Sequence, residues 1–484
     1  MLVIGVATGI LFAVVGVLEH RLERSPDPRA LSTFGPELAV FVVATLILFG
    51  LYLALLVMCA KRGLPAHSER VLAIAFPVVF NLVFVFVPPN LSTDLLSYIS
   101  HGYIATTLNG NPLVEPSRIV ADTPFGSELL RHGWRPEHGP SPYGPVWTYI
   151  EAAIVRASEG FERQMVGLKL VVAVASLGSA LLIWTILAHV RPERRLLGTL
   201  AYLWNPMIVI EVAKEGHNDS VMVFFVLLAL LLTIRGRGSG GFVAMSLGVL
   251  TKYLPLLLVP LQAAYLWRAR STTRRFARQV AVGVAVAAAL GSVLFAGLWE
   301  GTETWAEIRE FAQPGSPGFT GSTRSMAALV ASRFVSNASA KAVVDIALIL
   351  SFAVFMGVSA WLVRGSEELL RACAGVGVVY LLLVSPSYWP WYAVLPVALL
   401  AVVASDTALL VLLGLSVGAR LAAPLQILSF HGVLDWKVYL VLTWLLGVGL
   451  AVVVGVMSRW NRWSPFAPGV AFEEAASPMM RVQR

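Results

Sequence analysis

Charge is scarce in this sequence: Asp, Glu, Lys and Arg make up 13% of its 484 residues, against about 25% in an ordinary soluble domain. Cysteine is scarcer still. Cys59 and Cys373 are the two cysteines, and a widely separated pair gives neither a disulfide framework nor a zinc-ligand spacing. The phosphate-binding loop of P-loop nucleoside triphosphatases and the D-x-D pair that holds metal-bound sugar nucleotides are also absent. These absences argue against a disulfide scaffold, a zinc protein and a nucleotide-driven pump.

Long apolar runs fill the sequence instead. Hydrophobic residues make up 57% of the chain, and its mean hydropathy is +0.76. The runs at 37–58, 70–88, 279–298, 341–363 and 438–456 are each close to the roughly 20 residues that a helix needs to cross a bilayer. We therefore predict an all-α polytopic membrane protein.

The positive charges lie between these runs. The net charge is +8, and Lys and Arg gather in short loops at 61–70, 191–195, 235–237 and 268–278. Short basic loops mark the cytoplasmic side of a membrane protein, so the basic balance indicates topology and not a nucleic-acid partner. With these loops inside, both termini are expected in the cytoplasm. The first apolar stretch has no basic start and no cleavage site, so we expect a retained helix and not a signal peptide.

Fixing the basic loops inside predicts about 13 or 14 transmembrane helices in a single membrane-embedded unit that covers 1–484. The segments expected to be helical are 1–18, 37–60, 70–88, 165–190, 196–213, 219–234, 241–251, 253–267, 279–298, 341–363, 370–385, 391–404, 406–420 and 436–457. The two segments on either side of Lys252 lie between basic loops and are expected to form a hairpin of half-helices. Residues 458–484 are expected to be a cytoplasmic tail.

Two long polar regions are left on the outer face. The first, 89–158, opens with PPNLSTDLLSYISHGY and continues through HGPSPYGPVW. Its stretches 95–108 and 146–158 are expected to be juxtamembrane helices, the second amphipathic and lying along the interface. The second region, 299–340, is rich in Gly, Pro, Ser and Thr. Because the unusual polar residues gather on this face, we expect an active site there.

Asp94 is the first carboxylate after an apolar helix. It has two interpretations: a residue that caps the following helix, or a general base that deprotonates a hydroxyl at the membrane surface. Capping needs only one of residues 92–94 and does not account for the aromatic and histidine pattern that follows, with Tyr98 and His101. We favour the general base, with Tyr98 and His101 as sugar- or acceptor-binding residues.

A second polar cluster lies at an outer turn between two short apolar helices. It contains Glu215, His217, Asn218 and Asp219. Asn218 or Asp219 could simply cap the helix that begins at 219. Ionisable groups at a membrane boundary are nevertheless functional by default, so the alternative is that the cluster binds sugar hydroxyls or orients a base.

Four cations are candidates for a phosphate site. Lys252 is flanked by apolar residues and could either extend to the lipid headgroups or donate to a phosphate. Arg324 and Arg333, in the second outer region, and Arg135, in the first, are further candidates.

Turn and aromatic residues complete the set. His138 and Tyr143 lie in the turn HGPSPYGP, whose prolines are expected to shape a rigid loop. Tyr388, Trp389 and Trp391 lie in SPSYWPWY. They form either an interfacial aromatic belt or a wall on which a sugar ring or a prenyl chain stacks.

Together these motifs resemble the GT-C superfamily of integral membrane glycosyltransferases, and above all the bacterial polyprenyl-phosphate-mannose-dependent α-mannosyltransferases. The resemblance rests on TDLLSYISHGYIATTLNGNPL, PYGPVW, LWNPMIVIEVAKEGHNDSVM, KYLPLLLVP and SYWPWY, taken in this order. The motifs span most of 89–267 and one distal loop.

The resemblance implies a GT-C-like bundle that moves a hexose, above all mannose, from a polyprenyl-phosphate donor to a hydroxyl of a glycolipid or lipid-linked glycan, with inversion. In such enzymes the first-loop acid is catalytic, and that position falls to Asp94. The pattern often has two adjacent acids, where this chain has Thr93 and Asp94. Lys252, with Arg324, would stabilise the leaving phosphate in place of a metal, so no metal or other cofactor is expected.

The resemblance also implies a role in the bacterial cell envelope, in the cytoplasmic membrane, with the active site on the outer face. Two alternatives stay open. A lipid-linked sugar flippase or polytopic transporter would place charges near the midplane, often in two repeated halves, and no repeat is visible here. A ligase or phosphotransferase acting on a lipid-linked glycan would share the geometry and differ in the group transferred.

Overall fold

The computed structural model describes residues 1–23, 31–136, 139–270, 272–312, 321–430, 432–460 and 465–466. Within these ranges all regular secondary structure is helical, and no strand is found. The prediction of an all-α protein is confirmed.

The helices up to the end of the first polar region are α1 (Leu2–Glu23), α2 (Leu31–Arg62), α3 (His67–Val85), α4 (Asp94–Thr106), η1 (Ser117–Val120), α5 (Pro124–Arg131) and α6 (Pro145–Ala157). The middle of the chain forms α7 (Phe161–Val190), η2 (Pro192–Arg194), α8 (Arg195–Leu203), α9 (Pro206–Ile208), the π-helix η3 (Val209–Lys214), α10 (Asp219–Ile234), α11 (Gly238–Thr251), η4 (Leu254–Leu258), α12 (Val259–Arg268) and α13 (Thr273–Phe295).

The last part forms η5 (Glu303–Trp305), α14 (Ala306–Ala312), α15 (Thr323–Ala331), α16 (Asn337–Leu362), α17 (Ser366–Val379), η6 (Tyr380–Val384), η7 (Pro390–Ala393), α18 (Val394–Val403), α19 (Asp406–Phe430), α20 (Trp436–Trp444), η8 (Leu445–Gly449) and α21 (Leu450–Trp460).

Eight of the described helices are long and apolar enough to cross a membrane, and there is a ninth if the bent pair Pro192–Leu203 and Pro206–Lys214 is one span. Three shorter apolar helices, Asp219–Ile234, Gly238–Thr251 and Pro390–Val403, accompany them. Every apolar segment predicted from the sequence is helical over most of its length. Several are too short to span alone, so the long spans are fewer than the predicted 13 or 14.

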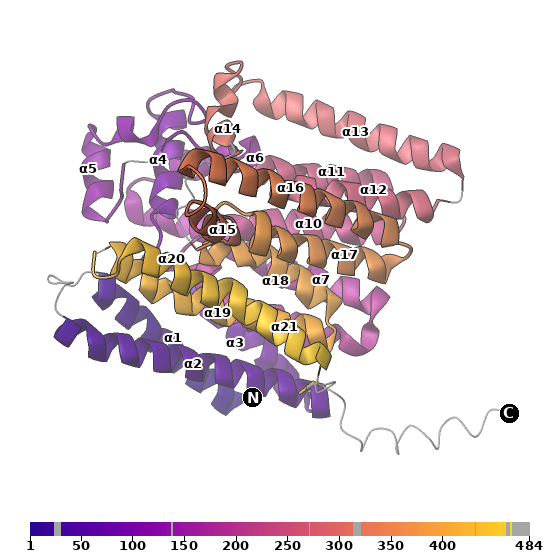
Figure 1. Cartoon of the computed structure of the whole chain (residues 1–484), viewed down its shortest axis with the longest axis horizontal. Coiled ribbons are helices and arrows are strands. Elements are labelled where there is room, and N and C mark those ends of the chain that lie inside the picture. Colours follow the sequence, from indigo (N-terminus) through magenta and orange to yellow (C-terminus); the bar gives the residue numbers. More distant parts are fainter. Residues whose placement is uncertain are drawn as a thin grey trace.

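The long helices run side by side, and α4 and α5 lie toward one end of them (Figure 1). At the centre, α10 packs against α7 and α11 and is buried over most of its length, as expected for a helix that is apolar on all sides. At the edge, α13 packs on α11, where Gly283 lies against Phe242, and most of its side chains are exposed. Exposed apolar side chains fit a helix that faces lipid.

The helix that leads to the second polar cluster is interrupted. Between α8 and α9 the axis bends by 43°, because the Asn205 side chain accepts the Met207 N–H at 3.0 Å and Pro206 starts α9. The π-helix η3 follows, and helices of this type are frequent at functional sites. Gly216, with φ +82°, then turns the chain beside Leu95 of α4. The interruption thus carries the second polar cluster to the start of α4.

In the first polar region, α4 and α6 confirm the helices predicted at 95–108 and 146–158. The two helices pack closely because Gly102 has no side chain: a Cβ there would lie 2.7 Å from the carbonyl oxygen of Glu151. Pro145 begins α6, and Pro124 begins α5 with Thr123 as its cap.

The PYGP turn fixes this region to the bundle. The Gly144 N–H donates to the Thr251 carbonyl, at the end of α11, at 3.0 Å. A Cβ on Gly144 would lie 2.1 Å from the Leu250 carbonyl oxygen, so this close approach of two backbones requires glycine. The contact brings Tyr143 next to Lys252.

Candidate active site

The polar residues of the first loop face a cavity of about 680 Å³. One wall is formed by the start of α4 and its preceding loop, and a second by the turn at 139–143. The remaining walls come from the ends of α10 and α11, from α14, and from the segments 377–396 and 426–427. The lining mixes charged, aromatic and aliphatic side chains, as sites for amphipathic ligands do.

Asp94 lies at the first turn of α4 and lines this cavity. Its Oδ2 accepts a hydrogen bond from the Tyr143 hydroxyl at 3.2 Å and lies 4.0 Å from Nε2 of His217. Its own backbone N–H donates to Ser92 Oγ at 3.1 Å. Ser92 therefore does the capping, and the carboxylate of Asp94 is left for other contacts.

Lys252 follows the end of α11 in extended backbone, and its ammonium lies over the ring of Tyr143. Its ammonium donates to both carboxylate oxygens of Asp219, at 2.9 Å each. The ammonium also lies 5.6 Å from the ring centre of Tyr143 and 5.3 Å from that of Tyr392, within the range of cation–π attraction. The side chain is 18% exposed and lines the cavity, so the cation is held where an anion can reach it.

His217, in the turn between η3 and α10, is oriented by the backbone of η3. Its Nδ1 lies 2.9 Å from the Glu211 carbonyl, and since a carbonyl only accepts, Nδ1 carries the proton and Nε2 faces Asp94. The imidazole stacks on Trp391 at 4.1 Å between ring centres, and Trp391 stacks on Trp389 at 5.2 Å. Both tryptophans line the cavity, so Asp94 lies close to an aromatic wall.

His101 lines the cavity two turns further along α4. It is 2% exposed, its Nδ1 lies 3.5 Å from Oε1 of Glu151, and neither ring nitrogen has a hydrogen-bond partner among the described residues. Burial lowers the pKa of His101 to about 4 and raises the pKa of Glu151 well above its usual value. Each group therefore favours its neutral form.

Comparison with known proteins identifies the family. A model of the alpha-(1->6)-mannopyranosyltransferase family, N-terminal domain, matches residues 2–269, more than half of the chain. The chain belongs to this family. A model of glycosyltransferase family 87 also matches, over residues 157–386. The GT-C-like resemblance found in the sequence is thereby confirmed.

A curated relative agrees. Alpha-(1->6)-mannopyranosyltransferase A of Corynebacterium glutamicum is 26% identical over 336 residues, which are 64% of this chain and 66% of the relative. The match thus spans just under two thirds of the relative's length. Within the family match lie Asp94, Tyr143, His217, Asp219 and Lys252, the residues that meet around Tyr143.

Other predicted residues of this family member lie away from the cavity. Glu215 is buried and accepts backbone N–H groups from residues 90–92. Asn218 is buried ahead of α10, and its side-chain amide has no partner among the described residues. Tyr98 is buried between Tyr143 and Trp147, and Tyr388 packs against Gly447.

Some of the predicted cations line the cavity and others do not. Arg135 lines the cavity with Lys252. Arg324 instead binds Asp345 of α16, with Nη2 2.5 Å from Oδ2, and is not among the lining residues. Arg333 is exposed, and His138 lies outside the described residues. Among those residues no group of three His, Cys, Asp or Glu side chains is placed to hold a metal ion.

Sequence reasoning missed a set of charges in the apolar helices. Glu19 near the end of α1, Glu211 and Lys214 in η3, and Arg420 in α19 are all buried together. Arg420 carried a usable signal, since an arginine inside an apolar helix is rare and commonly functional. Tyr392 and Gln426, which line the cavity, carried no comparable signal.

Proposed function

We propose that this protein transfers a mannosyl group from a polyprenyl-phosphate donor to a hydroxyl of a glycolipid or lipid-linked glycan acceptor, with inversion. The observation that carries the proposal is that Asp94 and Lys252 line one cavity and both contact Tyr143, Asp94 at its hydroxyl and Lys252 at its ring. A carboxylate and a cation in one site are the two groups that this transfer needs.

The acceptor hydroxyl would lie against Asp94, which takes its proton as the new bond to the anomeric carbon forms. The bond from that carbon to the phosphate oxygen breaks on the opposite face, and the phosphate leaves beside Lys252. Charge-assisted hydrogen bonds from the ammonium stabilise the developing charge. Lys252 can turn toward phosphate because the ion pair that holds it, with Asp219, lies at the cavity surface.

The rest of the lining fits the two lipid substrates. Leu254, Ile308, Leu381 and Ile427 give the cavity an apolar side, suited to a prenyl chain. Trp389 and Trp391 offer an aromatic wall for the sugar, and Asp219 offers a hydrogen-bonding group near it, while the buried His217 stacks behind Trp391 and does not line the cavity. Arg135 is the second phosphate candidate, and we leave Arg324 out because Asp345 holds it elsewhere.

We place this site on the outer face of the bacterial cytoplasmic membrane, opposite the basic loops. The membrane itself supplies both lipid substrates, so the protein needs no separate nucleotide site.

The test is transfer of radiolabelled mannose from polyprenyl-phosphate-mannose to a membrane acceptor fraction. We expect Asp94→Asn to lower transfer by about 10²–10⁴-fold, the usual contribution of a general base. Asp122→Asn is the matched control, because Asp122 is an exposed acid of the same region outside the cavity lining. It should transfer as the native protein does.

Two results would count against the proposal. If a folded Asp94→Asn variant transferred mannose at the rate of the native protein, Asp94 would not be the general base. A native protein that moves labelled polyprenyl-phosphate-mannose across the membrane, but transfers no sugar from mannose, glucose or arabinose donors, would favour the flippase.

A further inference from the structure

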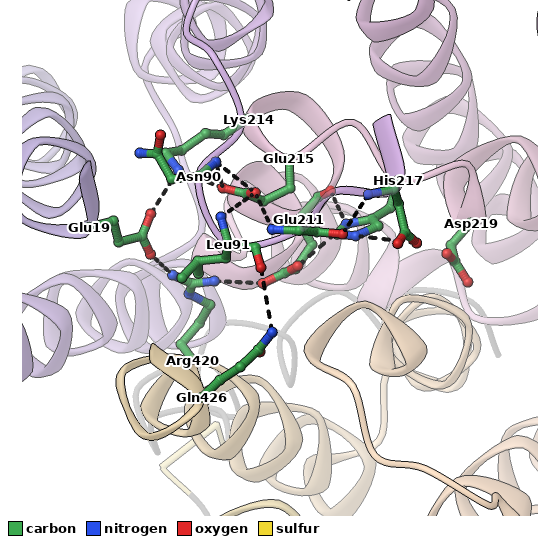
Figure 2. Close-up of polar contacts among 12 residues, drawn as sticks. Glu19, Asn90, Leu91, Glu211, Lys214, Glu215, His217, Asp219, Arg420 and Gln426 are labelled. Carbon is green, nitrogen blue, oxygen red and sulfur yellow. Dashed lines mark hydrogen bonds and ion pairs between the residues drawn. The ribbon is translucent and has the colours of Figure 1, made fainter. Parts of the chain in front are cut away.

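Five charged side chains are buried together beside the cavity and outside its lining: Glu19, Glu211, Lys214, Glu215 and Arg420. Figure 2 shows them converging from α1, from η3 and its end, and from α19. We call these five residues the buried ion network. None of the proposed steps above uses it.

The network is continuous. Lys214 Nζ lies 2.5 Å from Oε1 of Glu215 and 2.8 Å from Oε2 of Glu19. Arg420 pairs with Glu19 and lies 2.5 Å from Oε1 of Glu211. Glu19 thus joins the two cations, and each cation holds one acid of η3 or its end.

One end of the network grips the chain that leads to Asp94. Oε2 of Glu215 accepts the backbone N–H groups of Asn90, Leu91 and Ser92, at 3.1, 3.0 and 3.3 Å (Figure 2). Consecutive N–H groups that converge on one carboxylate form a strong anion-binding arrangement. Ser92 in turn accepts the backbone N–H of Asp94, so only one residue separates the gripped segment from the proposed base.

Neighbouring contacts hold the same segment. Lys169 of α7 donates to the Val87 carbonyl, and Gln426 of α19 donates to the Leu91 carbonyl at 3.4 Å. The chain from 87 to 92 is therefore fixed from three helices or helix ends. Two prolines at 88 and 89 restrict its backbone further.

Stability alone does not account for such a network. A buried ion pair costs so much desolvation that apolar residues of the same volume are often equally stable or better. Buried charges are worth retaining where they fix one geometry. A catalytic group must be held to within a fraction of an ångström, and a misplacement of about 1 Å can cost roughly 10²-fold in rate.

We propose that Glu215, one member of the buried ion network, is a positioning residue for Asp94. This inference rests on the proposed function, since it assigns a partner to the proposed base. Glu215 touches no substrate: it acts through the backbone of residues 90–92.

The experiment compares Glu215→Gln with Glu19→Gln. Both variants remove one negative charge from the buried ion network, but Glu19 pairs with the side chains of Lys214 and Arg420, whereas Glu215 also accepts the N–H groups of residues 90–92. We expect Glu215→Gln to lower kcat by about 10- to 100-fold, with KM for donor and acceptor within a factor of about two. Glu19→Gln should show a similar loss of Tm in detergent and keep most of the native kcat.

A second measurement does not depend on activity. Hydrogen exchange of the peptide that covers residues 88–95 should be faster in Glu215→Gln by at least about tenfold, because three N–H groups lose their carboxylate. Glu19→Gln should leave that peptide close to native.

Unchanged exchange in Glu215→Gln would overturn the positioning role, as would equal losses of kcat in the two variants. A native protein with no transferase activity would sink the proposed function instead. In that case the exchange measurement still decides whether Glu215 holds the segment.

Discussion

Two lysine–carboxylate pairs have their carboxylates close together in the sequence, and they differ in exposure. Lys252 binds Asp219 at the cavity surface, where the side chains are 18% and 3% exposed. Lys214 binds Glu215 inside the bundle, where they are 1% and 0% exposed. The two acids are four residues apart, on either side of the turn at Gly216.

The difference shows how one polar segment serves two purposes. The surface pair keeps a cation within reach of an incoming anion, and its partner can be exchanged. The buried pair has no access to ligand and instead fixes the backbone of residues 90–92. In the proposed function, exposure, and not residue type, separates the group that meets substrate from the group that supports it.

Replacing each lysine by methionine tests this contrast directly and should give the largest effects. Lys252→Met is expected to lower mannosyl transfer by about 10²–10³-fold, with Tm close to native. Lys214→Met is expected to cost about 3–5 kcal/mol of folding free energy, because it leaves the buried carboxylate of Glu215 without its cation. Transfer assays and Tm in detergent measure both. Similar losses of Tm in the two variants would break the distinction.

The buried pair of His101 and Glu151, in which both groups favour the neutral form, contrasts with the two ion pairs in how folding stability depends on pH. The pKa of His101 is lowered by burial to about 4, so its contribution to stability is present above its ordinary pKa and is lost as pH falls toward 4. Glu151 has a raised pKa, so its contribution is present at low pH and is lost as pH rises.

Variants separate the two contributions. With His101 alone titrating, in Glu151→Gln, stability should fall by about 2 kcal/mol between pH 7 and pH 5. In His101→Phe the remaining glutamic acid should give the opposite slope over the same range. Tm measured against pH tests this, and parallel slopes in the two variants would contradict the assignment of neutral forms.

The smallest effect is expected at Gln426, an outlying contact of the segment that Glu215 holds. Its amide lies 3.4 Å from the Leu91 carbonyl, a long hydrogen bond worth under about 1 kcal/mol. Gln426→Leu should therefore change kcat by less than about threefold, and steady-state kinetics would measure it. A loss as large as that of Glu215→Gln would place the support of Asp94 in α19 and not in Glu215.

Much of the fold could be predicted from the sequence because the bilayer restricts both length and charge. Apolar runs and basic loops located the helices, and the helices at 95–108 and 146–158 followed from apolar stretches too short to span. The number of helices that span the membrane was harder to predict, because α10 and α11 are apolar yet too short to count as full spans.

The site could be predicted in part, since local motifs carry residue identity but not direction. Asp94, Lys252 and Tyr143 do meet, as their shared face predicted. The contact between Arg420 and Glu19 could not be predicted, because it joins residues 401 positions apart. Glu215 points toward the backbone of residues 90–92 because of the π-helix and Gly216. Apolar periodicity and capping residues do not specify a π-helix.

The contact at Gly144 has a consequence for how the cavity can open. Because two backbones meet there without a side chain between them and share a hydrogen bond, we expect the turn at 139–145 and the end of α11 to move together. Two walls of the cavity are therefore fixed to each other at this contact. We expect any widening that admits a long lipid to come from the facing wall, the segment 385–392, where aromatic rings pack without such a lock.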